Sequence, residues 1–383
     1  MTKAESAAAT AQKGSFARGW PSLVLTLLVV LAAVYSFSHR PPPPFPATQV
    51  HPQGLLVNAL AVQGERYLAA GEQGRILIAD AADGPWREAS VQQQRDSTLT
   101  AVSFVAPKIA IAVGHDAWIL RSVDAGETWT EAAFSADRPE PLLGVAGPYD
   151  GKLYAHGAFG RFMVSSDLGQ TWQEQALVEE GAEPAAAAPA VDPNSEDYDP
   201  FAAYTNGASA GSALSERHLN AMTQTADGQL WLVGERGLLA RSGNGGASWT
   251  VLDPIYAGSL FGILELPSKD LLVFGMRGHA FVSRDAGATW TASTVPLPLS
   301  LFAGTVDSEG HAVLVGASDA VLKSTDNGAS FELVSQKDRR SIASVLALAG
   351  GGWLTGGEAG IKRQSPGIGR SLESSTPAAG EAP

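Results

Sequence analysis

The sequence has no cysteine, few histidines and a deficit of basic residues, and each shortage narrows what the chain can be. Without cysteine it forms no disulfide and carries no lipid on a thiol. A formal net charge of −13 argues against a nucleic-acid partner, because that binding depends on clustered Lys and Arg. The seven histidines are dispersed with no pair at metal-ligand spacing, so we expect neither a metal nor a cofactor.

What the sequence does contain is a repeat. A small-residue-rich strand ends in Gly, and another apolar strand follows about three residues later, mostly at intervals of 41 to 43 residues. Four short strands with their turns add up to about 40 residues, so one repeat corresponds to one blade. The sequence therefore predicts an all-β fold, a seven-bladed β-propeller. The repeated glycines are Gly71, Gly114, Gly157, Gly234, Gly275, Gly316 and Gly357.

Five copies continue into a box of the form Ser-x-Asp-x-Gly-x-Thr-Trp. We place the box in the turn between the third and fourth strands, where its Asp accepts backbone N–H groups and its aromatic residue packs between blades. The box resembles the Asp boxes of bacterial sialidases, which lie at the blade edge away from the chemistry. We therefore interpret the boxes as structural rather than catalytic. Their acidic or amide and aromatic positions are Asp124 and Trp129, Asp167 and Trp172, Asn244 and Trp249, Asp285 and Trp290, and Asp326 and Phe331.

The regions outside the repeats suggest an anchored, exported domain. Residues 20–38 form an apolar run after Lys3, Lys13 and Arg18, which predicts a transmembrane signal anchor with residues 1–19 in the cytoplasm. A cleaved signal peptide is the alternative. Residues 39–46 read as a Pro-rich spacer, 47–363 as the propeller and 364–383 as a disordered tail. We expect a single-pass protein of a bacterial inner membrane with its propeller in the periplasm.

Two irregularities interrupt the ring. The seventh repeat has only three strands, and we expect Ala47–His51 to complete it, because an open sheet edge is a hazard. An acidic insertion of residues 178–212 separates the third and fourth repeats and reads as a solvated loop, a lid or a partner-binding arm. Its carboxylates lack the spacing that would identify a calcium site.

The best candidate site is a set of arginines on the face of the turns between second and third strands. Arg236 and Arg277 hold the same register in neighbouring repeats, and the other members precede inner strands. Guanidinium groups bind carboxylates and phosphates bidentately, so the set suits an acidic partner; internal pairing with Glu72, Glu235 or Glu358 is the alternative. The remaining members are Arg95, Arg217, His218, Arg339 and Arg340.

Together, the anchor, the Gly repeat, the boxes and the basic patch resemble the photosystem II stability/assembly factor family, here as a relative from a non-photosynthetic bacterium. The resemblance implies a non-enzymatic propeller that binds a membrane subunit through arginines, and it carries over to Arg236 and Arg277, more weakly to Arg217, Arg339 and Arg340. It also implies an integral membrane protein or complex as partner, with a transporter of the resistance-nodulation-division type as one candidate.

Two other function classes remain open. A glycoside hydrolase or sialidase shares the boxes, but the chain lacks the Arg-Ile-Pro motif, and Tyr67, Tyr149, Tyr154 and Tyr256 lie in or near strands. Tyr198 and Tyr204 lie in the insertion, from which they could reach over the ring face. A propeller that binds a polysaccharide cannot be separated from the protein-binding interpretation by sequence.

Overall fold

The computed structural model describes residues 16–37, 50–180 and 214–364. The chain divides into two compact units, Met1–Thr48 and Gln49–Pro383. The first contains helix α1 (Phe16–Phe37), which covers the stretch predicted as an anchor. No helix among the described residues is long and apolar enough to cross a membrane, so the expected transmembrane segment is not confirmed. The expected cytoplasmic end (its first fifteen residues), the Pro-rich spacer and the tail from 365 onward lie outside the described residues.

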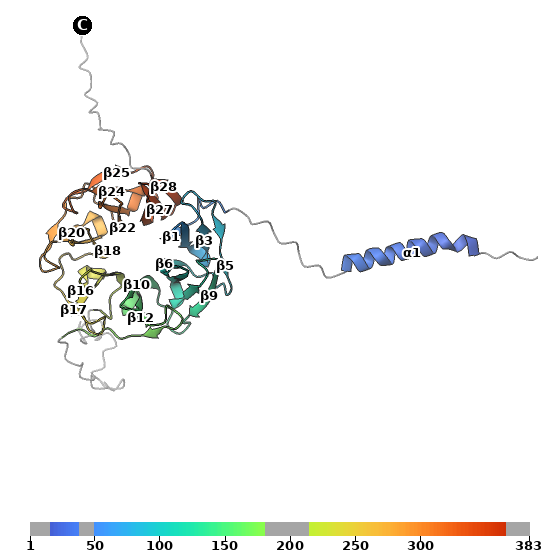
Figure 1. The fold of residues 1–383 in the computed structure, drawn as a ribbon, viewed down its shortest axis with the longest axis horizontal. Helices are drawn as coiled ribbons and strands as arrows, with labels where there is room; N and C mark the ends of the chain where they lie inside the picture. Colours follow the sequence, from blue (N-terminus) through green and yellow to red (C-terminus); the bar gives the residue numbers. More distant parts are fainter. Residues whose placement is uncertain (1–15, 38–49, 181–213, 365–383) are drawn as a thin grey trace, which may run out of the picture. The chain divides into compact units, whose positions relative to one another are not determined.

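The second unit is a ring of seven sheets that follow one another in chain order (Figure 1), as the repeat predicts. Their strands pair antiparallel except for the short β5 (Ser90–Val91), which pairs parallel with β9 (Thr128–Ala133). Blade one contains β1 (Val57–Gln63), β2 (Arg66–Gly71), β3 (Ile76–Ala79) and β4 (Arg87–Glu88). Blade two contains β5 (Ser90–Val91), β6 (Leu99–Ala106), β7 (Ile109–Gly114), β8 (Ile119–Ser122) and β9 (Thr128–Ala133). Blade three contains β10 (Leu142–Tyr149), β11 (Lys152–Gly157), β12 (Phe162–Ser165) and β13 (Gln173–Glu174).

Blade four contains β14 (Leu219–Gln224), β15 (Leu230–Gly234), β16 (Leu239–Ser242) and β17 (Thr250–Val251), and blade five contains β18 (Leu260–Glu265), β19 (Leu271–Gly275), β20 (Ala280–Ser283) and β21 (Thr291–Ala292). Blade six contains β22 (Leu301–Val306), β23 (Ala312–Gly316), β24 (Val321–Ser324) and β25 (Glu332–Ser335). Blade seven contains β26 (Ile342–Ala347), β27 (Trp353–Gly357) and β28 (Gly360–Gln364).

The repeated Gly at the end of each second strand has a steric cause. A Cβ at Gly275 would lie 2.1 Å from the carbonyl oxygen of Ser259, the residue before the inner strand β18. That carbonyl accepts a hydrogen bond from the N–H of Met276, at 3.0 Å. The same close approach occurs at all seven repeated glycines, where the added Cβ would lie 1.9–2.2 Å from a main-chain oxygen. The period read from the sequence is thus the period of this contact.

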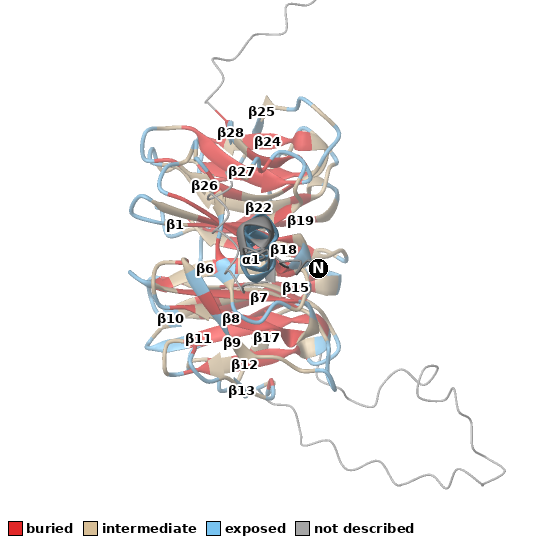
Figure 2. Ribbon diagram, turned by 90° about the vertical axis from the view of Figure 1, so that its right-hand side faces the viewer, coloured by how far each residue is buried: buried red, intermediate tan, exposed pale blue. Residues whose placement is uncertain are grey.

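The hydrophobic core is divided among the junctions between blades (Figure 2). One cluster joins blades one and two, where Leu68 and Ile78 pack with Leu120 and Trp129, and comparable clusters occupy the other junctions. The aromatic residue of every complete box belongs to one of these clusters or packs against it, as predicted. Trp129 and Trp249 are fully buried. Each blade is therefore stabilised mainly by its neighbours.

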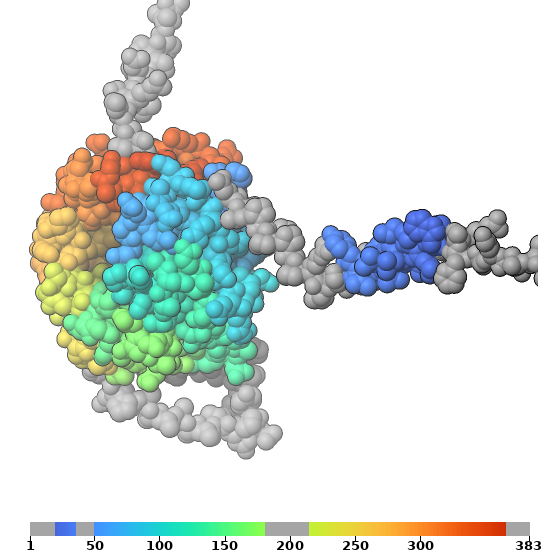
Figure 3. All heavy atoms as spheres, turned by 45° about the vertical axis from the view of Figure 1, so that its right-hand side comes forward, coloured from blue at the N-terminus to red at the C-terminus, as the bar shows by residue number. Residues whose placement is uncertain are grey.

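The ring closes by direct contact between blade seven and blade one, whose colours meet in Figure 3. The N–H of Leu60 on β1 donates to Ser344 Oγ on β26, at 3.0 Å. The predicted completion of blade seven is wrong for the residues described: Val50 pairs instead with Trp86 in blade one, its N–H 2.9 Å from the Trp86 carbonyl oxygen. Trp86 is fixed by the core at the junction and offers a free strand edge, which the lead-in segment takes. Among the described residues, blade seven has three strands.

The start of the predicted insertion also belongs to the ring. Glu179 forms a parallel bridge with Trp249, and the carboxylate of Glu180 accepts hydrogen bonds from the hydroxyls of Ser248 and Thr250. Residues 178–180 therefore run along the outer strand of blade four rather than beginning a loop. The remainder of the insertion, 181–213, lies outside the described residues, with Tyr198 and Tyr204.

Candidate functional site

The ring has two faces that differ in their turns. In an antiparallel four-stranded blade, the turns between strands one and two and between three and four lie on one face, and the turn between two and three lies on the other. We call the first the box face, because it carries the boxes. We call the second the mouth face. The predicted arginines belong to the mouth face.

On the box face, the boxes are hydrogen-bonded turns. In blade five, Asp285 Oδ1 accepts the N–H of Thr289 at 2.8 Å and the Ser283 hydroxyl at 2.8 Å, while Oδ2 accepts the Thr289 hydroxyl at 2.5 Å. The Thr289 hydroxyl, with the other donors, lowers the pKa of Asp285 to about 2, and the corresponding donors lower the pKa of Asp167 to about 2. Both oxygens of each of these carboxylates accept hydrogen bonds from the turn, which supports the structural interpretation.

The boxes also make contacts between neighbouring blades beyond the aromatic packing that the sequence predicted. Gly126 has φ +90°, and a Cβ there would lie 2.4 Å from Leu68 of blade one. The guanidinium of Arg121 in blade two donates from Nε to the carbonyl oxygen of Leu168 in the box of blade three, at 2.9 Å. A box thus closes its own turn and fits against the preceding blade.

On the mouth face, each described turn between second and third strands of blades one to six has a central residue with positive φ. The tight turn forces this left-handed conformation, so the central side chain projects from the ring. Its identity differs from blade to blade, unlike the residues of the boxes. The central residues are Gln73, Asp116, Phe159, Arg236, Arg277 and Ser318, with φ between 49° and 58°.

Arg236 and Arg277 are the predicted pair, and the structure places both at these exposed tips in adjacent blades. Neither guanidinium has a hydrogen-bond or ion-pair partner within the described part of the chain. Each turn is held by the connection that follows its blade. The N–H of Gly237 donates to the Gly258 carbonyl at 2.8 Å, and the N–H of Arg277 donates to Ser300 Oγ at 3.4 Å. Two fixed turns therefore present two uncompensated positive charges.

Aromatic rings flank these arginines, a feature that the sequence analysis missed. Phe159, at the tip of blade three, is 61 % exposed and meets His218 edge to face, with ring centroids 4.8 Å apart. Tyr256 and His279 lie at the junction of blades four and five with centroids 4.1 Å apart. The signal was present in the repeat alignment, because Phe159 occupies the register of Arg236. We call Phe159, Arg217, His218, Arg236, Tyr256, Arg277 and His279 the basic–aromatic sector.

Two of the predicted members have acidic partners within the ring, which agrees with the internal pairing considered as the alternative. Arg95 forms a bidentate ion pair with Glu131, 2.5 Å from Nε to Oε2, and its guanidinium lies 3.5 Å from the centre of the Phe134 ring. The hydrogen bond from Arg95 lowers the pKa of Glu131. Arg340 pairs with Asp338, with Nη2 2.8 Å from Oδ2. Both arginines stabilise their own blades.

Of the two remaining weaker candidates, one belongs to the basic–aromatic sector and the other does not. Arg217 is half-buried and belongs to the basic–aromatic sector, where its carbonyl accepts the N–H of Gly160 at 2.9 Å. Arg339 is exposed but lies in blade seven, outside that sector. The glutamates considered as internal partners accept main-chain N–H groups: Glu72, Glu235 and Glu358 accept those of Leu56, His218 and Ser341. Glu235 Oε1 also lies 3.7 Å from His218 Nδ1, so this member of the sector has an internal carboxylate beside it.

One possible metal-ligand group was missed. Asp307, Glu309 and His311 place one ligand atom each within 4.8 Å of one another. The i, i+2, i+4 spacing across a tight turn could have revealed it. Lys323 already supplies a positive charge there, with Nζ 2.9 Å from Asp307 and 3.2 Å from Glu309, so the group reads as an ion-pair cluster.

Comparisons with known proteins agree with a propeller. No protein-family model and no curated protein matches the chain. Among solved structures, it is similar to YCF48 bound to D1 peptide, with TM-score 0.60, 15% identity, and coverage of 84% of this chain and 99% of that one. YCF48 from Cyanidioschyzon merolae gives TM-score 0.59 and 14% identity over 83% and 98% of the two chains. Virginiamycin B lyase from Staphylococcus aureus gives TM-score 0.62 and 14% identity, with coverage of 83% of this chain and 97% of that one.

These identities establish the fold alone. The class is the seven-bladed β-propeller, and the sequence resemblance to the assembly-factor family is supported at the level of that fold. One of the similar structures, virginiamycin B lyase, carries the name of an enzyme. The fold by itself therefore does not decide between a binding function and a catalytic one.

Proposed function

We propose that the chain is a non-enzymatic propeller that binds a membrane protein complex through the basic–aromatic sector, as an assembly, stability or accessory factor. The observation that carries this proposal is the pair of uncompensated guanidinium groups on the fixed tips of blades four and five. Exposed arginine next to aromatic rings is the composition that dominates binding energy in protein interfaces. An acidic segment of the partner is the complementary chemistry.

Three further observations support the choice of partner. YCF48, whose fold this propeller resembles, has been seen bound to a D1 peptide. The chain as a whole is acidic, so solubility does not demand a basic sector. In α1, the large side chains from Trp20 to Tyr35 are exposed, which favours contact with an apolar environment and supports the proposed anchor in a bacterial inner membrane. A transporter of the resistance-nodulation-division type is one such partner.

Site-specific photo-crosslinking tests the proposal. Phe159 is replaced by p-benzoylphenylalanine in the full-length protein, a conservative change at an exposed ring. The matched control carries the same group at Val123, which is 56 % exposed in a turn on the box face. We expect an integral membrane polypeptide to crosslink from position 159 and not from 123. Equal crosslinking from both positions, or none from 159, would exclude the sector as the binding site.

The enzyme alternative makes a different prediction. A glycosidase would hydrolyse 4-methylumbelliferyl glycosides, and a polysaccharide-binding propeller would be retained on an immobilised polysaccharide. Within the described residues, Tyr154 is buried and its hydroxyl donates to the Gly245 carbonyl at 3.0 Å, so it does not serve as a nucleophile at the mouth face. Protein binding is the function that the geometry supports best.

A further inference from the structure

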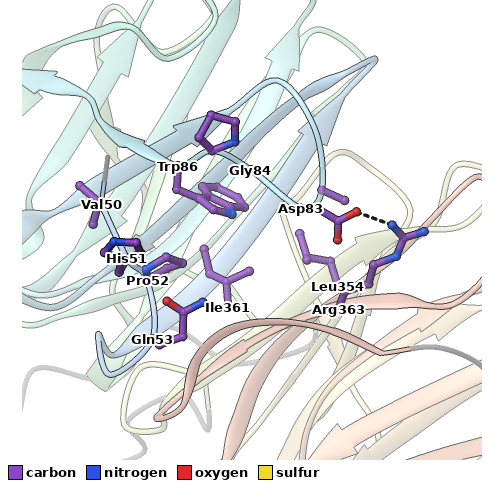
Figure 4. A pocket seen from close by; sticks show the side chains of 12 residues that line it. Val50, His51, Pro52, Gln53, Asp83, Gly84, Trp86, Leu354, Ile361 and Arg363 are labelled. Carbon is purple, nitrogen blue, oxygen red and sulfur yellow. Dashed lines mark hydrogen bonds and ion pairs between the residues drawn. The ribbon is translucent and has the colours of Figure 1, made fainter. Parts of the chain in front are cut away.

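The outer edge of blade seven differs from that of every other blade. Six blades have a fourth strand beyond the third, whereas among the described residues β28 is the last strand of its sheet. A hollow of about 530 Å³ lies beside this edge (Figure 4). Its lining comes from the lead-in segment at Val50–Gln53, from the turn before β4 in blade one, and from β27 and β28 of blade seven.

The register of β28 identifies the main-chain groups that face this hollow. The carbonyl oxygen of Lys362 accepts a hydrogen bond from Thr355 Oγ1 on β27, so Lys362 turns its main-chain groups toward β27. Main-chain groups alternate along an antiparallel strand, and those of Ile361 and Arg363 therefore point to the open edge. Both residues line the hollow. An N–H and C=O row of this kind is complementary to another main chain in extended conformation.

The walls add side-chain specificity. Trp86, Leu354 and Ile361 are no more than 5% exposed and form an apolar floor. Arg363 and Asp83 pair at one side of the hollow, 2.6 Å between Nη1 and Oδ2, and both remain partly open to solvent. The opposite wall is fixed, because the Pro52 carbonyl lies within 1.8 Å of where a Cβ of Gly360 would be.

We propose that this edge binds an extended segment of a partner polypeptide, which pairs antiparallel to β28 as the fourth strand of blade seven. The segment carries an apolar side chain toward Trp86, Leu354 and Ile361. Two residues earlier it carries a carboxylate next to Arg363, because the two strands of an antiparallel pair run in opposite directions and side chains on one face of a strand are spaced by two. This is β-strand addition, in which main-chain hydrogen bonds give affinity and the floor gives specificity.

The occupant is an extended peptide rather than a small ligand because, in each of the other six blades, an extended strand occupies the corresponding edge. In blade six, β25 places Glu332 opposite Lys323 of β24 and Val334 two residues later against the junction core. To an antiparallel strand, the open edge of blade seven offers the same order of environments, an arginine followed by an apolar floor. The proposal does not involve the mouth face and stands independently of the proposed function.

The probe is a labelled peptide with the sequence of residues 330–337, Ser-Phe-Glu-Leu-Val-Ser-Gln-Lys, titrated against the full-length protein by fluorescence anisotropy. We expect saturable binding that Arg363→Pro weakens by about tenfold or more, because it removes an edge N–H while proline is tolerated on an edge strand. Arg363→Ala keeps the N–H and changes affinity by about threefold at most. The Arg236→Glu/Arg277→Glu variant binds the peptide as the wild type does.

A second measurement keeps the test decisive if Arg363→Pro does not fold. Hydrogen exchange of the Ile361 and Arg363 amides is followed in the wild type with and without the peptide, and with a peptide N-methylated at the pairing positions. We expect fast exchange that the unmodified peptide slows and the methylated one does not. The proposal would be overturned if the peptide does not bind, or if methylation of the peptide leaves its binding unchanged. It would also be overturned if the two amides are already protected without peptide, because another part of the chain or a second copy would then cover the edge.

Discussion

On the box face, Asp124, Asp167, Asp285 and Asp326 accept the same hydrogen bonds from the same turn positions, whereas the tips of the mouth face carry a different side chain in nearly every blade. Each face carries a turn that recurs from blade to blade, and the difference lies in where the side chain points. Box side chains point into the turn and the junction, where they contribute to stability, while Gln73, Phe159, Arg236 and Arg277 are exposed at the tips.

A second contrast lies within the mouth face itself. Arg95 in blade two is held by Glu131 and Phe134, but Arg236 and Arg277 in blades four and five are uncompensated within the described residues. All three are arginines near the same face in sequence terms. Only the structure separates a residue that stabilises its blade from one that is available to a partner.

The sequence predicted the ring, its blade number and the box turns because these depend on local, repeated contacts. The interval between glycines reflects one steric contact, and the box hydrogen bonds span four residues. The short apolar runs of the fifth repeat predict four strands, and these agree with β18–β21 to within one or two residues at each end. The predicted ranges are Gly262–Glu265, Leu271–Phe274, His279–Ser283 and Trp290–Thr294.

Contacts between residues far apart in the chain could not be predicted from the sequence. The partner of Arg95 lies 36 residues away, and its position depends on how β9 pairs with β8. The pairing of Val50 with Trp86 instead of β28 depended on competition between two strand edges, which periodicity does not rank. The aromatic neighbours of the arginines come from the connections between blades, where no repeat applies.

The largest effect is expected where a box residue is removed from a junction. Trp129→Ala deletes a fully buried ring whose Nε1 donates to the Gly126 carbonyl at 2.9 Å, and we expect a loss of about 3–5 kcal/mol in the free energy of unfolding. Urea denaturation measures it. Arg277→Ala, at an exposed tip, is the matched control with a change of less than about 0.5 kcal/mol. Similar losses for both variants would break the distinction between the faces.

A smaller effect is expected from pH. The folded pKa of Asp285 is lowered to about 2, below the ordinary 3.8, so its contribution to stability is present above about pH 4 and is lost as the pH falls toward 2. Asp285→Asn should unfold with a weaker dependence on pH across this window, because blade four already uses the neutral Asn244 with the same bonds to Ser242 and Ser248. Urea midpoints measured between pH 5 and pH 2 test this, and identical profiles would mean that Asp285 does not titrate with folding.

The central claim is that the uncompensated arginines of the mouth face bind a membrane partner, and co-purification tests it most directly. Full-length wild type, Arg236→Glu/Arg277→Glu and Lys269→Glu/Arg284→Glu are purified from solubilised native membranes, and co-purified proteins are quantified by mass spectrometry. The last variant makes the same charge change at exposed sites on the box face of blade five. We predict a stoichiometric integral membrane partner that is lost only from the Arg236→Glu/Arg277→Glu sample. Retention of that partner by this variant in its folded form would contradict the account.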